Sequence, residues 1–264
     1  MAHSVALVGA LGRMGERVRA ALAAEAALSL GAALESPGHP GLGEKLDSGV
    51  TVSDDPVAAF AACPVAIDFS VPEATLAHLR VAARTGSAYV TGTTGFDAEQ
   101  SAELQALAQR VPILHAANFS LAVNVLAWLV GQATRKLGPD YATEIVELHH
   151  AAKRDAPSGT ALRLAEAIAA ARGGSLQEQL VLERAGEIGA RPEHAIGVQT
   201  LRGGDSAGEH SVYFLGSGER LELHHRASSR DHFARGAVRA ATWLVGKPPG
   251  LYRVEHALGL APGP

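Results

Sequence analysis

The segment at residues 4–28, SVALVGALGRMGERVRAALAAEAAL, constrains the fold more than any other stretch of the chain. It opens with a short apolar, β-branched run that ends at Gly9, and an Ala- and Leu-rich stretch typical of a helix follows. A buried strand, a glycine turn and a helix in this order form the first unit of a parallel sheet covered by helices. The sequence therefore predicts that the chain begins with such a sheet.

The same alternation continues through the first half of the chain. Strands are expected at residues 28–36, 65–70, 87–93 and 111–120, and helices at residues 72–86 and 96–110. Alternating strands and helices build a parallel sheet, because each helix returns the chain to start the next strand in the same direction. A further helix, expected at residues 233–246, is predicted to cross back and pack on this first sheet.

The second half of the chain has a different pattern. After an apolar helix at residues 121–138, strands are expected at 141–150, 194–205, 210–218 and 219–227 with few helices between them, which predicts a second, mostly antiparallel sheet. A chain of 264 residues suits two domains. We expect an α/β protein: a Rossmann-like dinucleotide-binding domain from residues 1–120 and 230–264, and an α+β domain with an open mixed sheet from residues 121–229.

Composition excludes several classes of protein. No apolar run approaches the roughly 20 residues that span a bilayer, and the N-terminal residues lack the pattern of a signal peptide, so we expect a cytoplasmic protein that does not bind membranes. The net charge of −4 and the absence of a long Lys/Arg run argue against nucleic acid as a partner. Cys63 is the single cysteine, which excludes an internal disulfide and predicts a small buried apolar side chain.

The glycine turn and the acid that follows it indicate a nucleotide site. Gly9, Gly12 and Gly15 are spaced G-x-x-G-x-x-G, and glycine lets the backbone approach a pyrophosphate at a helix N-terminus, although a tight turn alone also needs glycine. Glu35 lies 20 residues after Gly15, at the end of the second expected strand, where a carboxylate accepts hydrogen bonds from ribose hydroxyls. The two features together predict a dinucleotide cofactor.

The choice between NADH and NADPH depends on cations near Glu35. Ser36 follows it directly and no Lys or Arg occurs before Lys45, so the usual partner of a 2′-phosphate is missing and NADH is favoured. Arg13, in the glycine turn, could reach such a phosphate, and use of both cofactors stays open. The TGTTGF segment at residues 91–96 suits either a loop beside the nicotinamide carboxamide or a simple turn.

The segment ELHHAAKRDAPSGTA at residues 147–161 combines a possible proton donor, a cation and the start of a helix. Alternation along a strand places Glu147 and His149 on one face and His150 on the other. An imidazole that faces a cleft can donate a proton, and Lys153 either binds a carboxylate or is a solvated loop residue. Ser158 or a neighbour caps a helix whose first amides, with Thr160, face an anion pocket. No metal site is expected, because no zinc-binding spacing is present.

These motifs resemble one enzyme family along nearly the whole chain. GALGRMG, GTTGF, AANFS, ELHHAAKRDAPSGTA and ASSRDHFARGAVRAA occur in the order found in the 4-hydroxy-tetrahydrodipicolinate reductases, also called dihydrodipicolinate reductases. The resemblance implies NAD(P)H-dependent reduction of a small cyclic dicarboxylate in lysine and diaminopimelate biosynthesis. It also implies a homotetramer formed through the open sheet of the second domain.

The resemblance also assigns residues by their position in each motif. It implies that His149 donates the proton with assistance from Lys153, and that the substrate is contacted by His150, Lys153, Gly159 and Thr160. The cofactor contacts that it implies are Gly9, Ala10, Leu11, Gly12, Arg13, Met14, Glu35, Gly92, Thr93, Thr94, Ala116, Ala117, Asn118 and Phe119.

Two other functions remain to be weighed. Another two-domain NAD(P)-dependent dehydrogenase of amino or hydroxy acids would share the nucleotide half, but it would not need the HHxxK and PSGT elements together. A regulatory protein that senses NAD(H) would bind the cofactor without turnover.

Overall fold

The computed structural model describes residues 2–261 and divides the chain into two compact units. The first unit holds the residues up to 121 and those from 231 onward, and the second holds residues 122–230. The chain passes between the units twice, at 121/122 and at 230/231. Each unit has its own sheet and its own hydrophobic core.

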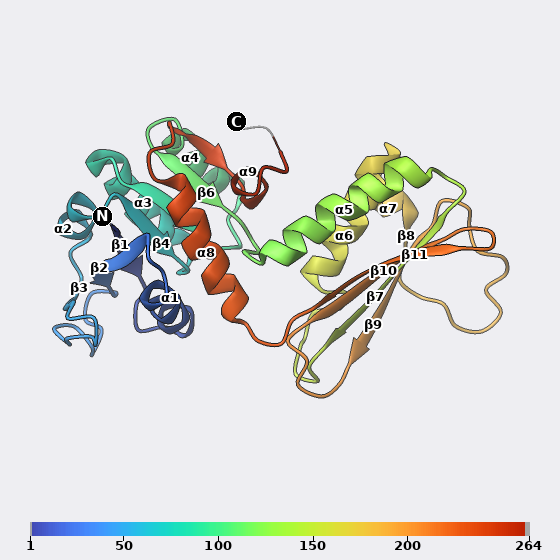
Figure 1. Ribbon diagram of the computed structural model, residues 1–264, viewed down its shortest axis with the longest axis horizontal. Coiled ribbons are helices and arrows are strands. Elements are labelled where there is room, and N and C mark those ends of the chain that lie inside the picture. The colour runs from blue at the N-terminus through green and yellow to red at the C-terminus, as the bar shows by residue number, and fades with distance from the viewer. Residues whose placement is uncertain (1, 262–264) are drawn as a thin grey trace. The chain divides into compact units, whose positions relative to one another are not determined.

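The first unit contains a seven-stranded, fully parallel sheet, with α8 running along it (Figure 1). The strand order is β12-β6-β5-β4-β1-β2-β3, so the order reverses between β1 and β4. The strands are β1 (His3–Val8), β2 (Leu28–Leu34), β3 (Val52–Ser53), β4 (Val65–Asp68), β5 (Ala88–Thr91), β6 (Pro112–His115) and β12 (Gly250–Tyr252). The helices are α1 (Arg13–Ala23), α2 (Pro56–Ala62), α3 (Pro72–Thr85), α4 (Ala98–Leu107), α8 (Asp231–Leu244) and α9 (Val254–Ala257).

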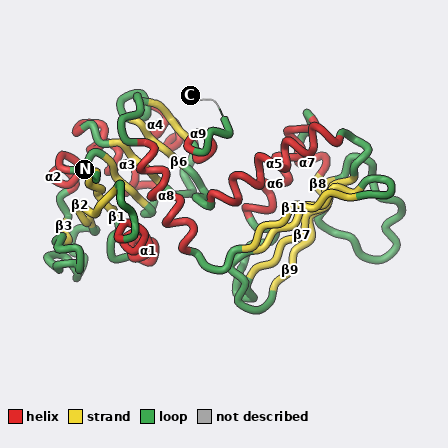
Figure 2. Tube along the Cα trace, viewed as in Figure 1, coloured by secondary structure: helices red, strands yellow, loops and turns green. Residues whose placement is uncertain are grey.

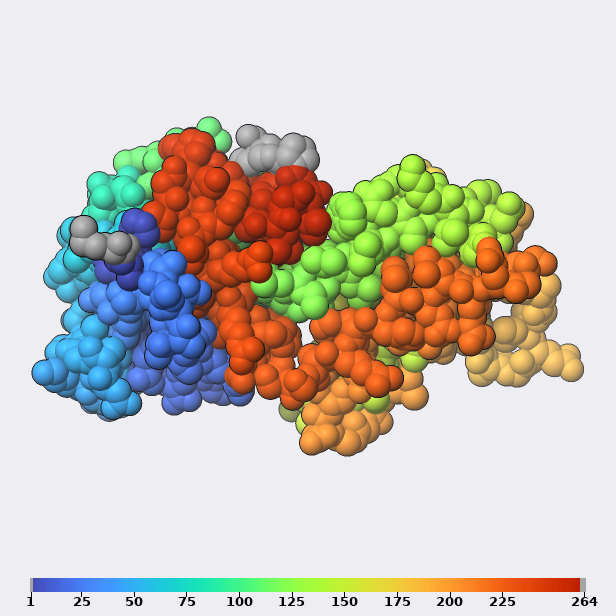
Figure 3. All heavy atoms as spheres, in the orientation of Figure 1, coloured from blue at the N-terminus to red at the C-terminus, as the bar shows by residue number. Residues whose placement is uncertain are grey.

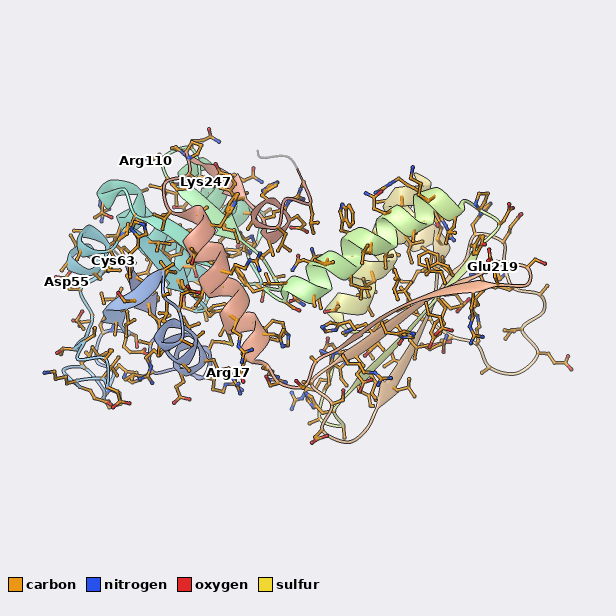
Figure 4. The ribbon with its side chains drawn as sticks, viewed as in Figure 1. Arg17, Asp55, Cys63, Arg110, Glu219 and Lys247 are labelled. Carbon is orange, nitrogen blue, oxygen red and sulfur yellow. The ribbon has the colours of Figure 1, made fainter. Side chains whose placement is uncertain are left out.

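Helices cover both faces of this sheet. Strand side chains such as Leu7 and Ile67 pack with α1 and α8 on one face, and Ala6 and Ala66 pack with α2, α3 and α4 on the other. The expected return of a late helix to the first sheet is therefore confirmed. An ion pair between Arg17 of α1, labelled in Figure 4, and the first residue of α8 joins these two helices.

Local signals explain where several helices begin and end. Asp97 caps α4 and forms a reciprocal capping box with Gln100. The α3 helix begins at Pro72 and ends at Thr85, where Gly86 forms the C-cap with a φ of 81° that suits glycine. Cys63 is 2% exposed, as expected for a small buried side chain. None of the helices among residues 2–261 combines the length and apolar character that a membrane crossing requires.

The second unit is a five-stranded sheet in the order β11-β10-β7-β9-β8. Figure 2 shows its strands beneath the helices α5 and α6. The strands are β7 (Ala142–His149), β8 (Leu180–Val181), β9 (Ile196–Arg202), β10 (Glu209–Leu215) and β11 (Arg220–Arg226), and the helices are α5 (Leu121–Leu137), α6 (Gly159–Arg172) and α7 (Leu176–Gln179). The loop at residues 182–195 projects from this unit (Figure 3), and it exposes Ile188.

The expectation of a mostly antiparallel second sheet was wrong. Strand β10 is antiparallel to β7 and β11, but β9 is parallel to β7 and β8 is parallel to β9. The cause is α6, which follows β7 and returns the chain so that the later strand enters beside β7 in the same direction. The sheet is mixed, as the expected fold class states.

Candidate functional site

The predicted cofactor residues lie after successive strands at one edge of the first sheet. The glycine turn follows β1, Glu35 follows β2, Gly92 to Thr94 follow β5, and Ala116 to Phe119 follow β6. All of these strands are parallel, so their carboxyl ends share an edge. Ligands of open parallel sheets bind at this edge where the strand order reverses, which here is between β1 and β4.

The glycine turn has the geometry of a phosphate-binding turn. Gly9 has a φ of 67°, and Gly12 is the N-cap of α1 with no side-chain cap. A Cβ on Gly15 would lie 2.1 Å from the Gly9 carbonyl oxygen, so only glycine allows α1 to approach β1 this closely. The side chain of Arg13 is exposed and forms no hydrogen bond or ion pair with any described residue.

Glu35 is tied to the glycine turn. Its Oε1 accepts a 2.7 Å hydrogen bond from the Leu11 amide, while Oε2 has no hydrogen-bond partner within residues 2–261. Ser36 beside it is exposed. One carboxylate oxygen therefore braces the turn, and the other can accept a bond from a ligand hydroxyl.

Two of the predicted cofactor residues have side chains committed to the core. The Thr93 hydroxyl lies 2.7 Å from the Thr75 hydroxyl, in a buried network that includes Asp68 and Tyr89. Phe119 is 1% exposed and packs edge-on against the ring of Phe69, with ring centroids 5.6 Å apart. These side chains support the loops, and any contact to a cofactor would come from their backbone groups.

The second constellation lies at the end of β7. As the strand alternation predicts, Glu147 and His149 share the buried face, at 0% and 8% exposure, and His150 does not. The Nδ1 atom of His149 is 2.5 Å from Glu147 Oε2, and both Nη atoms of Arg202 on β9 donate to the same carboxylate at 2.9 Å. His210 on β10 stacks edge-on against His149, with centroids 5.2 Å apart.

The charges in this cluster shift several pKa values. Burial lowers the pKa of His149 below its ordinary value, and the carboxylate of Glu147 only partly opposes this effect. Burial would raise the pKa of Glu147, but the hydrogen bonds from Arg202 and His149 outweigh it and hold that pKa below the ordinary range. Burial, with the nearby His149, lowers the pKa of His210 to about 3, so this ring is uncharged.

The remaining predicted substrate residues lie at the start of α6 and in the segment between β7 and α6. Ser158 caps the helix, as expected, with its hydroxyl 3.2 Å from the Ala161 amide, and Gly159 and Thr160 form the first turn. The Lys153 ammonium pairs with Asp155 at 2.8 Å and lies near enough to His149 to lower its pKa. His150, on the opposite side of the strand, contacts Arg230 at 3.2 Å through its Nε2.

Sequence reasoning missed three residues of this cluster. Arg202, Thr200 and His210 reach it from β9 and β10, because β7 is paired on both sides. The pairing of Glu147 with His149 had a signal in the sequence, since the two residues stand two apart on one strand. Within residues 2–261, no group of three or more His, Cys, Asp or Glu side chains is arranged to hold a metal ion.

The chain joins a Rossmann-like sheet to an α+β unit that holds a buried histidine–carboxylate pair. These features define the class of two-domain dinucleotide-dependent oxidoreductases. Comparison with known proteins narrows it. The family model for the N-terminus of dihydrodipicolinate reductase matches residues 3–119, and the model for its C-terminus matches residues 122–258. The chain belongs to the dihydrodipicolinate reductase family.

Individual relatives agree with this assignment. The 4-hydroxy-tetrahydrodipicolinate reductase of Anaeromyxobacter dehalogenans strain 2CP-1 is 47% identical over 266 residues, covering 98% of each chain. The enzyme of the same name from Anaeromyxobacter sp. strain Fw109-5 is 50% identical over 262 residues, covering 97% of this chain and 98% of the relative. Among solved structures, a dipicolinate-bound dihydrodipicolinate reductase from Paenisporosarcina sp. TG-14 matches with a TM-score of 0.80 at 25% identity, covering 97% of this chain and 99% of the other.

Proposed function

We propose that this protein catalyses the NAD(P)H-dependent reduction of 4-hydroxy-tetrahydrodipicolinate to tetrahydrodipicolinate in lysine and diaminopimelate biosynthesis. The observation that carries the proposal is the match of both units to one reductase family. In this chain, the buried His149 lies beside Lys153 and the N-terminus of α6. A small cyclic dicarboxylate supplies the anionic groups that this arrangement of cation and helix amides favours.

The residues of the second unit would bind the substrate and supply the proton. Lys153 and the first turn of α6, with Gly159 and Thr160, would hold the carboxylates, and His150 would complete the contacts. His149 would then protonate the ring as it is reduced. Since burial lowers the pKa of His149 in the free protein, a dianionic substrate beside it would raise that pKa and load the ring with its proton.

The residues of the first unit would bind the dinucleotide, which when bound supplies a hydride. The turn from Gly9 to Met14 would receive the pyrophosphate, and Glu35 would accept bonds from a ribose through Oε2. The loops at residues 92–94 and 116–119 would line the same edge of the sheet. We therefore assign cofactor binding to the first unit, and substrate binding to the second.

We propose that NADH is preferred over NADPH. The Glu35 carboxylate would repel a 2′-phosphate at the ribose, and exposed Ser36 offers no positive charge to offset this repulsion. Arg13, an exposed cation in the glycine turn that Glu35 braces, would keep some use of NADPH available. The preference is the ratio of kcat/KM for NADH to kcat/KM for NADPH, and the same absorbance assay measures both values.

We propose further that the open face of the second sheet forms the interface of a homotetramer. The described helices of this unit lie on one face, and the other face carries apolar side chains that include Val146, Leu148, Leu201 and Leu215. Leu201 and Leu215 are 49% and 38% exposed. Exposed apolar side chains on an uncovered sheet face are the kind of surface that oligomers bury.

The test of the reaction follows the absorbance of NADH and of NADPH with freshly generated 4-hydroxy-tetrahydrodipicolinate. We expect oxidation of the cofactor by the wild-type protein, and a loss of about 10² to 10⁴ in kcat in His149→Gln, the usual contribution of a general acid. Cofactor binding without any oxidation would instead support an NAD(H)-sensing protein. Turnover that is unaffected by His149→Gln would point to another dehydrogenase mechanism.

A further inference from the structure

The Glu147 carboxylate is surrounded by hydrogen-bond donors. Its Oε1 accepts from the Ser158 amide at 3.0 Å, from the Thr200 hydroxyl at 3.1 Å and from Arg202 Nη2 at 2.9 Å. Its Oε2 accepts from Arg202 Nη1 at 2.9 Å and lies 2.5 Å from His149 Nδ1. A carboxylate offers about four lone-pair sites, so this one is saturated by groups on β7, β9 and the start of α6.

This crowding determines where the shared proton lies. Four of the five contacts are donated to Glu147, by the Ser158 amide, the Thr200 hydroxyl and the two Nη atoms of Arg202. The side chain of Glu147 is fully buried. The same donors hold the pKa of Glu147 below its ordinary value, so the carboxylate carries no proton of its own. His149 must therefore be the donor at Nδ1.

The other ring nitrogen of His149 faces a different environment. The Nε2 atom faces Gly208, where a Cβ would lie 2.9 Å from it. Because this residue is glycine, no side chain occupies that position. Gly208 has a φ of 142°, which favours glycine there. Nδ1 is thus hydrogen-bonded to Glu147, and no side chain of Gly208 covers Nε2.

We propose that Glu147 is the positioning residue of this site: it fixes the Nδ1–H form of His149, so that Nε2 is the atom that delivers the proton. This inference rests on the proposed function. Once the 4-hydroxyl group has left as water, hydride adds to the conjugated ring that remains. The Nε2–H bond of the imidazolium breaks, and its proton passes to the other end of that conjugated system. The neutral imidazole that remains keeps its Nδ1–H bond to Glu147, and Nε2 takes a new proton from water.

The pH response of His149 depends on every charged group around it. Glu147 on β7 favours the protonated ring, while Lys153 after β7 and Arg202 on β9 disfavour it. His210 on β10 also faces the ring, with His225 of β11 behind it, and Asp155 pairs with Lys153 and accepts a bond from Arg202 through its carbonyl oxygen. Replacing Glu147 by a neutral group removes the one contribution from a carboxylate in direct contact.

The first test needs no turnover, and its one variant serves only to assign signals. Two-bond ¹H–¹⁵N spectra of the histidine-labelled wild-type protein report which ring nitrogen carries the proton, and His149→Gln identifies the His149 signals. We expect the Nδ1–H form for the neutral ring. An Nε2–H form would overturn the proposal outright, whatever reaction the protein catalyses.

The second test follows the titration of His149 in Glu147→Gln. We expect its midpoint to fall by at least about one pH unit, a tenfold lower protonation constant, because the carboxylate charge is lost. The matched control is Glu144→Gln, which changes another arginine-paired glutamate of β7 whose side chain lies on the opposite face from His149. A midpoint that moves equally in both variants, or in neither, contradicts the proposal.

The third test separates positioning from substrate binding. With 4-hydroxy-tetrahydrodipicolinate and NADH, Glu147→Gln should lower kcat by about 10² while KM for the ring substrate stays within roughly threefold, and the fall of kcat at high pH should begin at lower pH. A loss expressed in KM alone would assign Glu147 to binding and overturn the proposal. If the wild type shows no turnover, the proposed function fails, while the nuclear magnetic resonance tests still decide the role of Glu147.

Discussion

The close approach of α1 to the turn after β1 predicts a large difference between two nearby glycines, Gly12 and Gly15. In Gly15→Ala, the new Cβ would stand 2.1 Å from the Gly9 carbonyl oxygen and 2.6 Å from that of Ala10. Carbon–oxygen contacts begin at about 3.3 Å, so α1 would have to retreat from the turn by roughly 1 Å. Neither obstacle is a flexible side chain. Strain must therefore appear in the backbone of β1 and α1.

The expected cost follows from two opposing effects. Overpacking of this kind costs about 1–3 kcal/mol, and backbone obstacles place Gly15→Ala at the upper end. Alanine in a helix recovers about 1 kcal/mol over glycine. The net loss in the free energy of unfolding is about 2 kcal/mol, which raises the unfolding equilibrium constant roughly 30-fold.

Gly12→Ala is the matched control for stability. Its Cβ would lie 3.4 Å from the Gly9 oxygen, an ordinary contact, and its φ of −75° accepts any residue. Alanine is a poorer N-cap than glycine by about 0.5 kcal/mol, so we expect only a small loss. Its methyl group would instead obstruct the proposed pyrophosphate site, and we expect NADH affinity to fall at least about tenfold.

The assay uses the position of the two tryptophans. Trp243 lies in the first unit, where it packs on Tyr252, and Trp128 lies in the second. In a Trp128→Phe background, urea unfolding followed by fluorescence reports the first unit alone, and NADH titration gives the affinity. If Gly15→Ala proves as stable as Gly12→Ala, the close strand–helix approach does not limit this fold and the reasoning is refuted.

Three further changes test other parts of the structure. Ser36→Arg should raise kcat/KM for NADPH relative to NADH about tenfold in the coupled absorbance assay, because a guanidinium can pair with a 2′-phosphate; an unchanged ratio would place the ribose elsewhere. Leu201→Glu on the open sheet face should yield a smaller species in sedimentation velocity, whereas Val57→Glu, 53% exposed on α2, should leave the assembly intact. His210 binds its proton more weakly in the folded protein, where its pKa is about 3, than in the unfolded chain, where it is 6.5. The neutral ring therefore contributes its full stability above pH 6.5. That contribution is lost as pH falls toward 3, by about 1.4 kcal/mol per pH unit. Urea unfolding of the wild type and of His210→Phe between pH 7 and 5 should diverge accordingly, and parallel curves would show that this ring is not held neutral by burial.

Local patterns predicted the parts of the structure that depend on neighbours in sequence. The glycine turn, the cap at Ser158, and the shared face of Glu147 and His149 all follow from spacings of a few residues. Thr93 and Phe119 show the limit of the same reasoning. Their motif position marks the loop, but only the packing of Asp68, Thr75 and Phe69 shows that their side chains belong to the core.

The wrong topology of the second sheet and the missed Arg202 have one physical cause. Because β9 runs parallel to β7, the ends of both strands lie together and His149 pairs with Arg202 in register. In an antiparallel pairing over the same seven residues of β9, Arg202 would sit at the opposite end of β7, roughly 20 Å away at about 3.3 Å per residue. Glu147 would then be a buried carboxylate with no guanidinium, which costs several kcal/mol or forces it to be protonated. A protonated Glu147 could not hold His149 in the Nδ1–H form, so the direction of β9 is a condition for the acid that we assign to this site.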